Sequence, residues 1–478
     1  MRRSVQLAGL ALAIALGACA TVGPDFEHPA APSTNSYAGP ADRAVTSRVQ
    51  LTPSSNTPAE WWTSFGSDEL NGLVQDAFAH NQTLAEADAN LDQARAAAAA
   101  TSGGALPQVN ANASGVRERI NTASFGFTGF PSPTISLYSI GANVSFDFDL
   151  FGGRRRAIER DEAHAAAQQA RVDAAYLTVS GNVVQQAILI AGLQEKVAAQ
   201  NEIVSGDEHI LDMVHRAIQA GGQPPAATNT IQAQLAEDQA ALPGLRQQLA
   251  QAQHRLALYL GRTPSDGPNS ALTLASLQVP GAAPVSLPSD LVRRRPDILA
   301  AEAELHAATA NIGVQTAALY PNISLNASWA QSAINPSDIF QATSAGWSVG
   351  PSITAPIFHG GTLRQEVHVA NAEQRAALAR YQQTVLEAFV QVSDTLQGIS
   401  NNEDLVIVQG RAVATANANV RNNDFAYRNG AGTLLSLVDA QRQANRARLS
   451  EIDARVAYYQ SIAALFVATA ADWRAAQP

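Results

Sequence analysis

The chain has 478 residues, of which 46% are hydrophobic and 15% are charged, and its formal net charge is −10. This balance excludes a disordered chain, which would bury too little apolar surface, and a helical membrane protein, whose spans are long apolar runs. The negative charge argues against nucleic acid as a partner, because binding phosphates requires a basic face.

Residues 1–18 have the features of a secretory signal peptide. Arg2 and Arg3 give a positive start, and the apolar run after them is too short to span a membrane as a helix. The run ends in Leu-Gly-Ala-Cys at Cys19, the only cysteine of the chain, and this sequence looks like a bacterial lipobox. We therefore predict a covalent lipid on Cys19. The alternative is an ordinary signal peptide followed by a chance cysteine.

The next two segments differ sharply in pattern. Residues 19–58 are rich in Pro, Ala, Ser and Thr and lack apolar periodicity, so we expect an extended, lipidated tether on the surface. The segment from Glu60 to about Thr101 is expected to be helical because its apolar residues fall on one face. Those residues are Leu70, Leu73, Val74, Ala77 and Phe78.

Two pairs of segments alternate between apolar and polar residues, as strands with two different faces do. The expected strands are 107–119, 140–150, 321–332 and 346–358. The second strand of each pair is followed by a Gly-Gly sequence that opens a long helix. The same arrangement of two strands and a helix therefore occurs twice.

Both long helices carry an apolar residue at every seventh position, which is typical of a coiled coil. The first series runs from Tyr176 to Ile218, and adding 209 to each position gives the later series from Val385 to Tyr427. Matching registers indicate an internal duplication. Residues 361–427 would extend about 100 Å as a helix, far beyond the roughly 23 Å radius of gyration of a compact domain of this length. This helix must therefore form a rod or the wall of a tube.

Each long helix is expected to turn and return as a second helix. The first turn is proline-rich at Pro224 and Pro225, and its return helix should kink or split at Pro243. A shorter helix is expected from Arg295 to Ala318, and the last return arm should reach about Trp473. The expected organisation is a signal peptide at 1–18, a tether at 19–58, a first repeat at 59–262, a linker at 263–289 and a second repeat at 290–478.

The strands match a transmembrane β-barrel better than a helical span, since each has about ten residues and two different faces. A small soluble sheet is the alternative, but the apolar face has no remaining domain to pack against. Four strands cannot close a barrel, for which about eight is the minimum. Three copies of the four strands would supply twelve, so the sequence predicts a homotrimer.

The assembled pattern resembles the outer-membrane factor family of Gram-negative bacteria, namely TolC and especially the lipidated OprM/NodT branch. The resemblance implies a fold that is mainly α with a membrane β-barrel, in which a homotrimeric 12-strand barrel sits on an α-helical tunnel. The matching motifs are Leu-Gly-Ala-Cys19 with Thr21 to Phe26 after it, Trp61-Trp62 through Asn81, Arg294 to Ile298 with Ala301-Glu302, Ile312-Gly313, and Tyr427 through Arg442.

The resemblance implies a passive, gated duct in the bacterial outer membrane that extends into the periplasm. The duct would belong to a tripartite efflux system and export small molecules such as drugs or toxic compounds. Its partners would be a periplasmic adaptor and an inner-membrane pump, expected to be of the RND type. Ala20 is consistent with sorting to the outer membrane. Whether the first turn, with Pro224 and Pro225, contacts the adaptor is left open.

The resemblance also places a periplasmic gate at Leu435, Asp439 and Arg442. Leu435 would form an apolar constriction, and Asp439 a ring of three carboxylates that favours cations. Arg442 would pair with carboxylates of a neighbouring helix and hold the closed state. Without the resemblance, Asp439 and Arg442 are an ordinary exposed i, i+3 pair contributing only about 0.2–0.5 kcal/mol.

The sequence contains no nucleophile elbow, P-loop or dinucleotide fingerprint, so we expect neither an enzyme nor a cofactor beyond the lipid. His209, Asp212 and His215 share a helix face, but a solvated surface is favoured over a metal site because no other ligand group supports them. Two other functions remain open. One is a duct for protein or polysaccharide secretion, and the other is a periplasmic adaptor, which would have a single hairpin between all-β domains.

Overall fold

The computed structural model describes residues 21–30, 36–39, 42, 47, 49–53, 60–126, 128–222, 224–268, 270–285 and 288–469. The predicted signal peptide and Cys19 lie outside these residues. The described chain divides into two compact units. The first takes residues from 1–29, 90–168 and 300–381, and the second takes residues from 30–89, 169–299 and 382–478.

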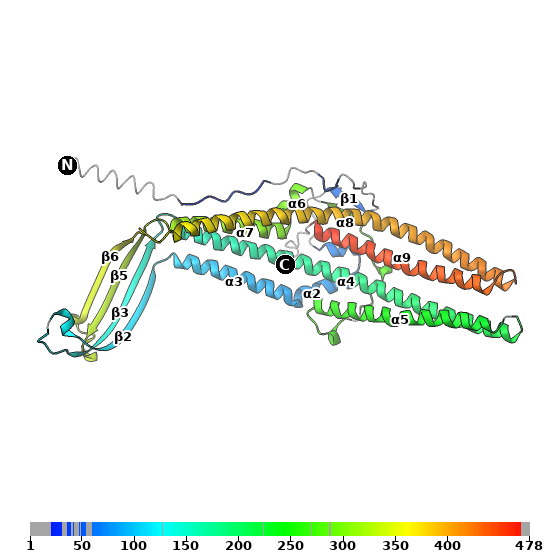
Figure 1. Cartoon of the computed structure of the whole chain (residues 1–478), viewed down its shortest axis with the longest axis horizontal. Helices are drawn as coiled ribbons and strands as arrows, with labels where there is room; N and C mark the ends of the chain where they lie inside the picture. Colours follow the sequence, from blue (N-terminus) through cyan, green and yellow to red (C-terminus); the bar gives the residue numbers. More distant parts are fainter. Residues whose placement is uncertain are drawn as a thin grey trace. The chain divides into compact units, whose positions relative to one another are not determined.

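The first unit contains a four-stranded antiparallel sheet in the order β2-β3-β5-β6 (Figure 1). The bounds are Gln108–Arg119 for β2, Thr134–Phe148 for β3, Asn322–Ala333 for β5 and Ala345–Thr354 for β6. All four predicted strands are present. β3 begins before Ile140 because the apolar residues Ile135 and Leu137 continue the strand on its other face. β6 stops before Pro356, which has no backbone N–H to donate.

The sheet has one apolar and one polar face. Residues directly opposite each other in neighbouring strands lie on the same face, so the register assigns each row to one side. One apolar row is Val109, Val144, Ala327 and Val349, and the row beside it is Asn110, Asn143, Ser328 and Ser348. The alternation predicted from each strand separately is therefore in phase across all four strands.

The apolar face of this sheet is uncovered in a single chain. The exposed fraction is 68% for Val109, 77% for Trp347 and 61% for Val349. The edge strands β2 and β6 each pair on one side only, which leaves two open edges on the described sheet. An uncovered apolar face and unpaired edges both need a further partner, either lipid or another chain.

The two long helices are α4 (Gly153–Gln219) and α8 (Thr362–Arg428), each of 67 residues. α8 agrees with the prediction to within one residue at each end. None of the heptad residues in either helix is exposed, and Val183, Ile190, Val392 and Ile399 are completely buried. The seven-residue repeat therefore identifies the face that packs against the rest of the chain.

The return helices are α5 (Ala226–Tyr259) and α9 (Leu434–Ala468). Of the two outcomes predicted at Pro243, a kink or a split, the split is wrong, because α5 continues through this residue. The proline removes one backbone hydrogen bond, to the carbonyl of Gln239. Both residues are exposed, so water can satisfy that carbonyl and the helix need not break. Trp473, the predicted end of the second arm, lies outside the described residues.

The second unit has an aromatic core. The 3₁₀ helix Trp61–Phe65 buries Trp61, Trp62 and Phe65, and the ring of Trp61 stacks on Phe466 of α9 with centroids 5.5 Å apart. Helix α2 (Asp68–His80) follows, with the Ser67 hydroxyl as its N-cap. The other α-helices in the described ranges are α3 (Gln82–Gly104), α6 (Pro288–Arg294) and α7 (Pro296–Ala317).

A second, smaller sheet joins the segments that were expected to be tether and linker. Strand β1 (Gln50–Pro53) pairs in parallel with β4 (Ala282–Val285). Leu272, Leu274 and Leu277 of the expected linker are also buried in the core of the second unit. Strands of four residues are too short for their alternation to stand out in a sequence, so neither was predicted.

Candidate functional site

The ends of the two helical hairpins meet within the second unit. A buried apolar cluster joins α4, α5 and α9 there, and Tyr427 near the end of α8 packs against it. Its buried members are Ile210, Val214, Ile231, Leu434 and Val438. The two hairpin ends, predicted only as separate turns, are therefore one packed structure.

Leu435 and Asp439 of α9 are exposed, and each directly follows a residue of this cluster in the helix. The helix begins after Thr433, whose hydroxyl accepts a hydrogen bond from the Ser436 N–H at 3.1 Å. Leu435 is 60% exposed, and Asp439 is also exposed one turn later. Residues four apart share a helix face, so the two side chains form a single apolar and acidic surface. The structure therefore brings these two predicted gate residues together.

Arg442 joins the second hairpin to the first. Its Nη2 lies 3.4 Å from Oε2 of Glu237 on α5. The expected partner of Arg442 is a carboxylate on a neighbouring helix, and the carboxylate that lies beside it within the chain is Glu237. The distance is long and Glu237 is 65% exposed, so the pair contributes little by itself.

A pair of acids that the sequence did not single out lies beside Arg442. Asp207 of α4 is only 6% exposed and interacts with Asp238 of α5 and with the charge of Arg442. The two aspartates lie on the two arms of the first helical hairpin, with the turn of the hairpin between them in sequence, and neither belongs to a motif. Only their position in the folded hairpin brings them together.

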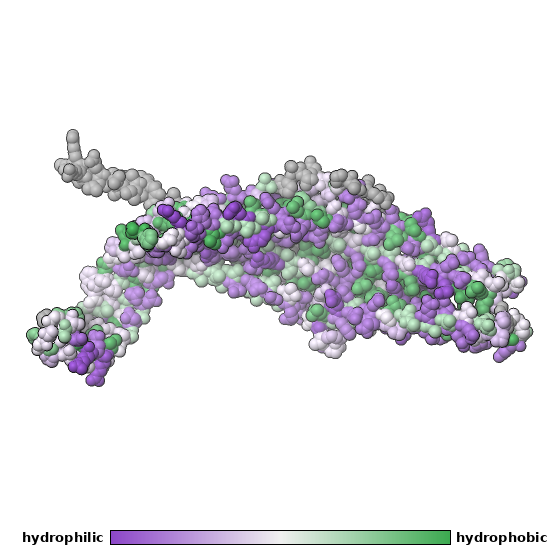
Figure 2. All heavy atoms as spheres, viewed as in Figure 1, coloured by the Kyte–Doolittle hydropathy of each residue, from purple (hydrophilic) through white to green (hydrophobic). Residues whose placement is uncertain are grey.

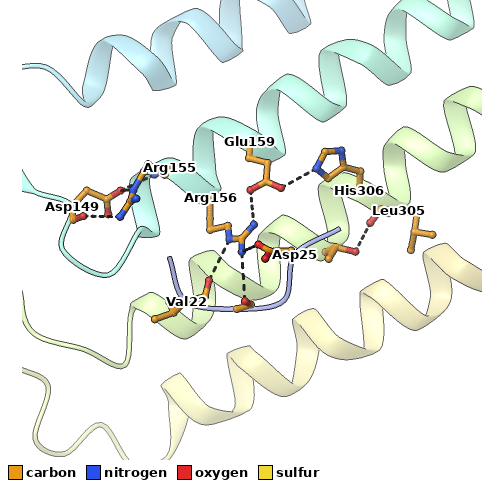
Figure 3. Close-up of polar contacts among 10 residues, drawn as sticks. Val22, Asp25, Asp149, Arg155, Arg156, Glu159, Leu305 and His306 are labelled. Carbon is orange, nitrogen blue, oxygen red and sulfur yellow. Dashed lines mark hydrogen bonds and ion pairs between the residues drawn. The ribbon is translucent and has the colours of Figure 1, made fainter. Parts of the chain in front are cut away.

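A second polar network lies in the first unit, where the N-terminal segment binds to Arg156 of α4 (Figure 3). This guanidinium is only 4% exposed, and its Nη2 lies 2.6 Å from Oδ1 of Asp25. Its Nη1 lies 2.7 Å from Oε2 of Glu159, and it also donates to the carbonyl oxygen of Val22. The segment that follows the predicted lipid site is thus held by a buried cation.

His306 of α7 completes this network. Its Nε2 lies 2.9 Å from Oε1 of Glu159 (Figure 3), and its ring stacks on Phe26 with centroids 4.4 Å apart. Burial alone would raise the pKa of the Glu159 carboxyl, but the hydrogen bonds and positive charges of His306 and Arg156 lower it. Glu159 is therefore a carboxylate that links α4, α7 and the N-terminal segment.

The histidine group considered as a metal site has ordinary surface surroundings. His209 and His215 are exposed, and Asp212 pairs with Arg216 at 2.9 Å. Over the described ranges, no three His, Cys, Asp or Glu residues are grouped to hold a metal ion. Helix α4 is long and apolar enough to cross a membrane, but 61% of the relevant stretch is buried inside the protein. That burial is typical of a core helix.

The chain is similar to known proteins over nearly its whole length. The family model "Outer membrane efflux protein" matches residues 73–262 and 287–471. "Pyoverdine export outer membrane protein OpmQ" of Pseudomonas aeruginosa is 29% identical, covering 98% of this chain and 97% of that protein. "Cation efflux system protein CusC" of Escherichia coli is 27% identical, covering 98% and 99%. The structure of the outer-membrane channel OprN matches with a TM-score of 0.86 and 27% identity over 95% of this chain and 99% of that one.

Proposed function

Because this chain belongs to the outer membrane efflux protein family, we propose that it is the outer-membrane duct of a tripartite efflux system. The fold is that of TolC-like outer-membrane channels, and the protein is located in the outer membrane and extends into the periplasm. The family consists of channels, not enzymes. We further propose that the duct is passive, opens and closes at its periplasmic end, and carries small molecules.

The observation that carries this proposal is the four-stranded sheet with its continuous apolar face. Soluble proteins rarely leave such a face uncovered, whereas a membrane protein turns it toward lipid. The opposite face is polar, as the wall of a water-filled channel must be. The open edges of β2 and β6 fit closure by further copies, so we propose a homotrimer with twelve strands.

The long helices also support a trimer. The surface in view in Figure 2 has scattered hydrophobic patches among hydrophilic ones. In the second unit, α8 exposes several large apolar side chains that a second copy would cover. They are Leu386, Val390, Leu405, Val408 and Phe425.

We propose that a periplasmic adaptor and an inner-membrane pump of the RND type complete the system. The names of the relatives include pyoverdine export and cation efflux, which are two different kinds of small cargo. We propose drugs or other toxic small compounds as the cargo. Lipid attachment at Cys19 would add an anchor to the membrane contact made by the strands.

We assign the gate to Leu435, Asp439 and Arg442. In a trimer whose α9 helices surround the axis, the exposed face of α9 would place three Leu435 side chains and three Asp439 carboxylates around the opening. A ring of carboxylates in a narrow pore attracts cations and repels anions. The ion pair of Arg442 with Glu237 would help to keep the two hairpins of each chain together.

The test is the conductance of the purified protein in a planar bilayer, comparing wild type with Asp439→Ala. We expect a small cation-selective conductance whose selectivity falls several-fold in the variant, because the ring loses three charges. Asp266→Ala is the matched control, since Asp266 is an exposed aspartate in the 3₁₀ helix Pro264–Asp266, outside the long helices. It should leave the selectivity unchanged. A pore with equal selectivity in all three proteins would remove the gate assignment, and a native trimer without any pore would refute the duct.

A further inference from the structure

Asp207 is a buried acid, and one of its two carboxyl oxygens receives no hydrogen bond from the described residues. It is 6% exposed, and in the part of the chain that the structure describes its Oδ2 has no hydrogen-bond donor. A buried carboxylate without donors is costly, because the interior does not replace the water it has lost. A protonated carboxyl in the same position is neutral and can donate a hydrogen bond itself.

Asp238 provides the acceptor for that proton. Its own oxygens are supplied with donors, since Gln200 Nε2 lies 3.3 Å from Oδ1 and the Gln234 side-chain amide donates to Oδ2. Gln200 is almost completely buried and also binds the main-chain oxygen of Asp238 at 2.9 Å. Both amides therefore donate to the Asp238 carboxyl, whereas Oδ2 of Asp207 receives no donor from the described residues.

We propose that Asp207 and Asp238 share one proton and form a pH-sensitive latch that holds α4 and α5 together behind the gate helix α9. In acid the pair carries one negative charge and one hydrogen bond. Loss of the proton leaves two carboxylates facing each other in a poorly hydrated place, which pushes the two helices apart. The consequence for channel opening rests on the function proposed above, whereas the shared proton does not.

The surrounding charges decide the pH range. Burial, together with the hydrogen bond and negative charge of Asp238, raises the pKa of the Asp207 carboxyl to about 7, although the positive charge of Arg442 opposes this. From α9 the group that faces Asp207 is Arg442, and from α5 it is Asp238, while Glu237 engages the far side of Arg442. The transition therefore falls near neutral pH.

The direction of the pH dependence follows from the proton that is released on opening. When the junction opens, Asp207 reaches water and its pKa returns toward that of an ordinary carboxyl, so opening releases one proton. Between that ordinary value and about pH 7, each fall of one pH unit should make opening about tenfold less favourable. Above about pH 7 the closed form has already lost the proton, and the dependence should level off.

The proton itself can be observed by infrared spectroscopy of the full-length protein in detergent. We expect the carbonyl band of a neutral carboxylic acid at about pH 6 that disappears by about pH 8. Asp207→Asn should abolish this band, because its amide replaces the protonated acid. Asp212→Asn is the matched control on the same helix, with an exposed carboxyl, and should leave the band unchanged. Absence of a titrating band in the wild type, or its survival in Asp207→Asn, would overturn the proposal.

Hydrogen exchange of the helical segments around Asp207 and Asp238 measures the latch without a pore. After correction for intrinsic exchange, wild type should open about fiftyfold more readily at about pH 7 than at about pH 5. In Asp207→Asn the amides of these segments should remain protected at both pH values, and Asp212→Asn should behave like wild type. A wild type whose opening does not depend on pH would refute the latch. The Asp439→Ala selectivity test is unaffected by this outcome, so failure of the latch and failure of the gate are distinguishable.

Discussion

Arg156 differs from the two arginines that precede it because its side chain is buried. Arg154, Arg155 and Arg156 are chemically identical in the sequence, and nothing in their order marks the third as special. In the structure Arg155 is 50% exposed beside Asp149 (Figure 3), while Arg156 is 4% exposed and holds the N-terminal segment. A buried guanidinium with two carboxylate partners contributes far more than an exposed pair.

We predict that Arg156→Ala releases the segment around Asp25 and Phe26. The change removes charge-assisted hydrogen bonds worth about 1.5–3 kcal/mol each in buried settings, although the 92% exposure of Asp25 reduces its share. Cleavage by chymotrypsin after Phe26 should become about tenfold faster or more. Arg155→Ala, the matched control, should be cleaved at the wild-type rate. Equal rates in both variants would show that Arg156 does not hold the segment.

The gate residues and the Asp207 pair show why a site is only partly predictable at this scale. Leu435, Asp439 and Arg442 lie within one short helical stretch, so a family motif could point to them. Their gate role stays a prediction. The Asp207–Asp238 pair comes from two helices that run in opposite directions. No spacing rule links the two residues, because their distance is set by packing.

At the scale of elements, periodicity was the reliable signal. The seven-residue repeat runs from Val385 to Tyr427 within α8, and the bounds of this helix are predicted to within a residue. Strands β1 and β4 have four residues each and were missed, because such a short run carries no period. The helix does not split at Pro243, because a proline on an exposed helix face costs one hydrogen bond and does not have to end the helix.

Close packing between α4 and α9 depends on small residues that no periodicity marks. A Cβ atom added at Gly192 would lie 2.2 Å from Cγ2 of Val456, and one at Gly181 would lie 2.7 Å from Cγ2 of Val467. Gly206, on the same helix α4, has nothing within 4 Å of its would-be Cβ. The helix therefore offers a tight glycine and a free one for comparison.

We predict opposite effects of alanine at these two glycines. Gly192→Ala should destabilise the protein by about 1–3 kcal/mol, because Val456 must move within a packed core. Gly206→Ala should stabilise it by up to about 1 kcal/mol, since alanine is the better helix former. Thermal unfolding of the purified protein measures both. Val456→Ala combined with Gly192→Ala should recover part of the loss, and the absence of such coupling would show that the contact is not limiting.

At the scale of the whole molecule, the sheet register decides which surface meets lipid. Predicting strands one at a time gave the alternation, but only pairing shows that Val109, Val144 and Val349 belong to one row. A single chain leaves this row exposed and both sheet edges unpaired. The exposed apolar row needs lipid to cover it, and the unpaired edges need strands of further copies. These are the physical reasons to expect both a bilayer and an oligomer.

Adjacent residues on β6 test this assignment, because they point to opposite faces of the sheet. We predict that Val349→Arg prevents stable insertion, since arginine on the lipid face of a barrel costs about 2–4 kcal/mol near the bilayer midplane. Trimers built from three such chains would bear the cost three times. Outer-membrane fractionation followed by electrophoresis of unheated samples should show loss of the trimer band. Ser348→Arg places the same charge on the polar face and loses only an exposed hydroxyl contact with Ser328, so its trimer should survive. If Ser348→Arg were lost and Val349→Arg retained, the polar face would be the one in lipid, and the direction of the sheet would have to be reversed.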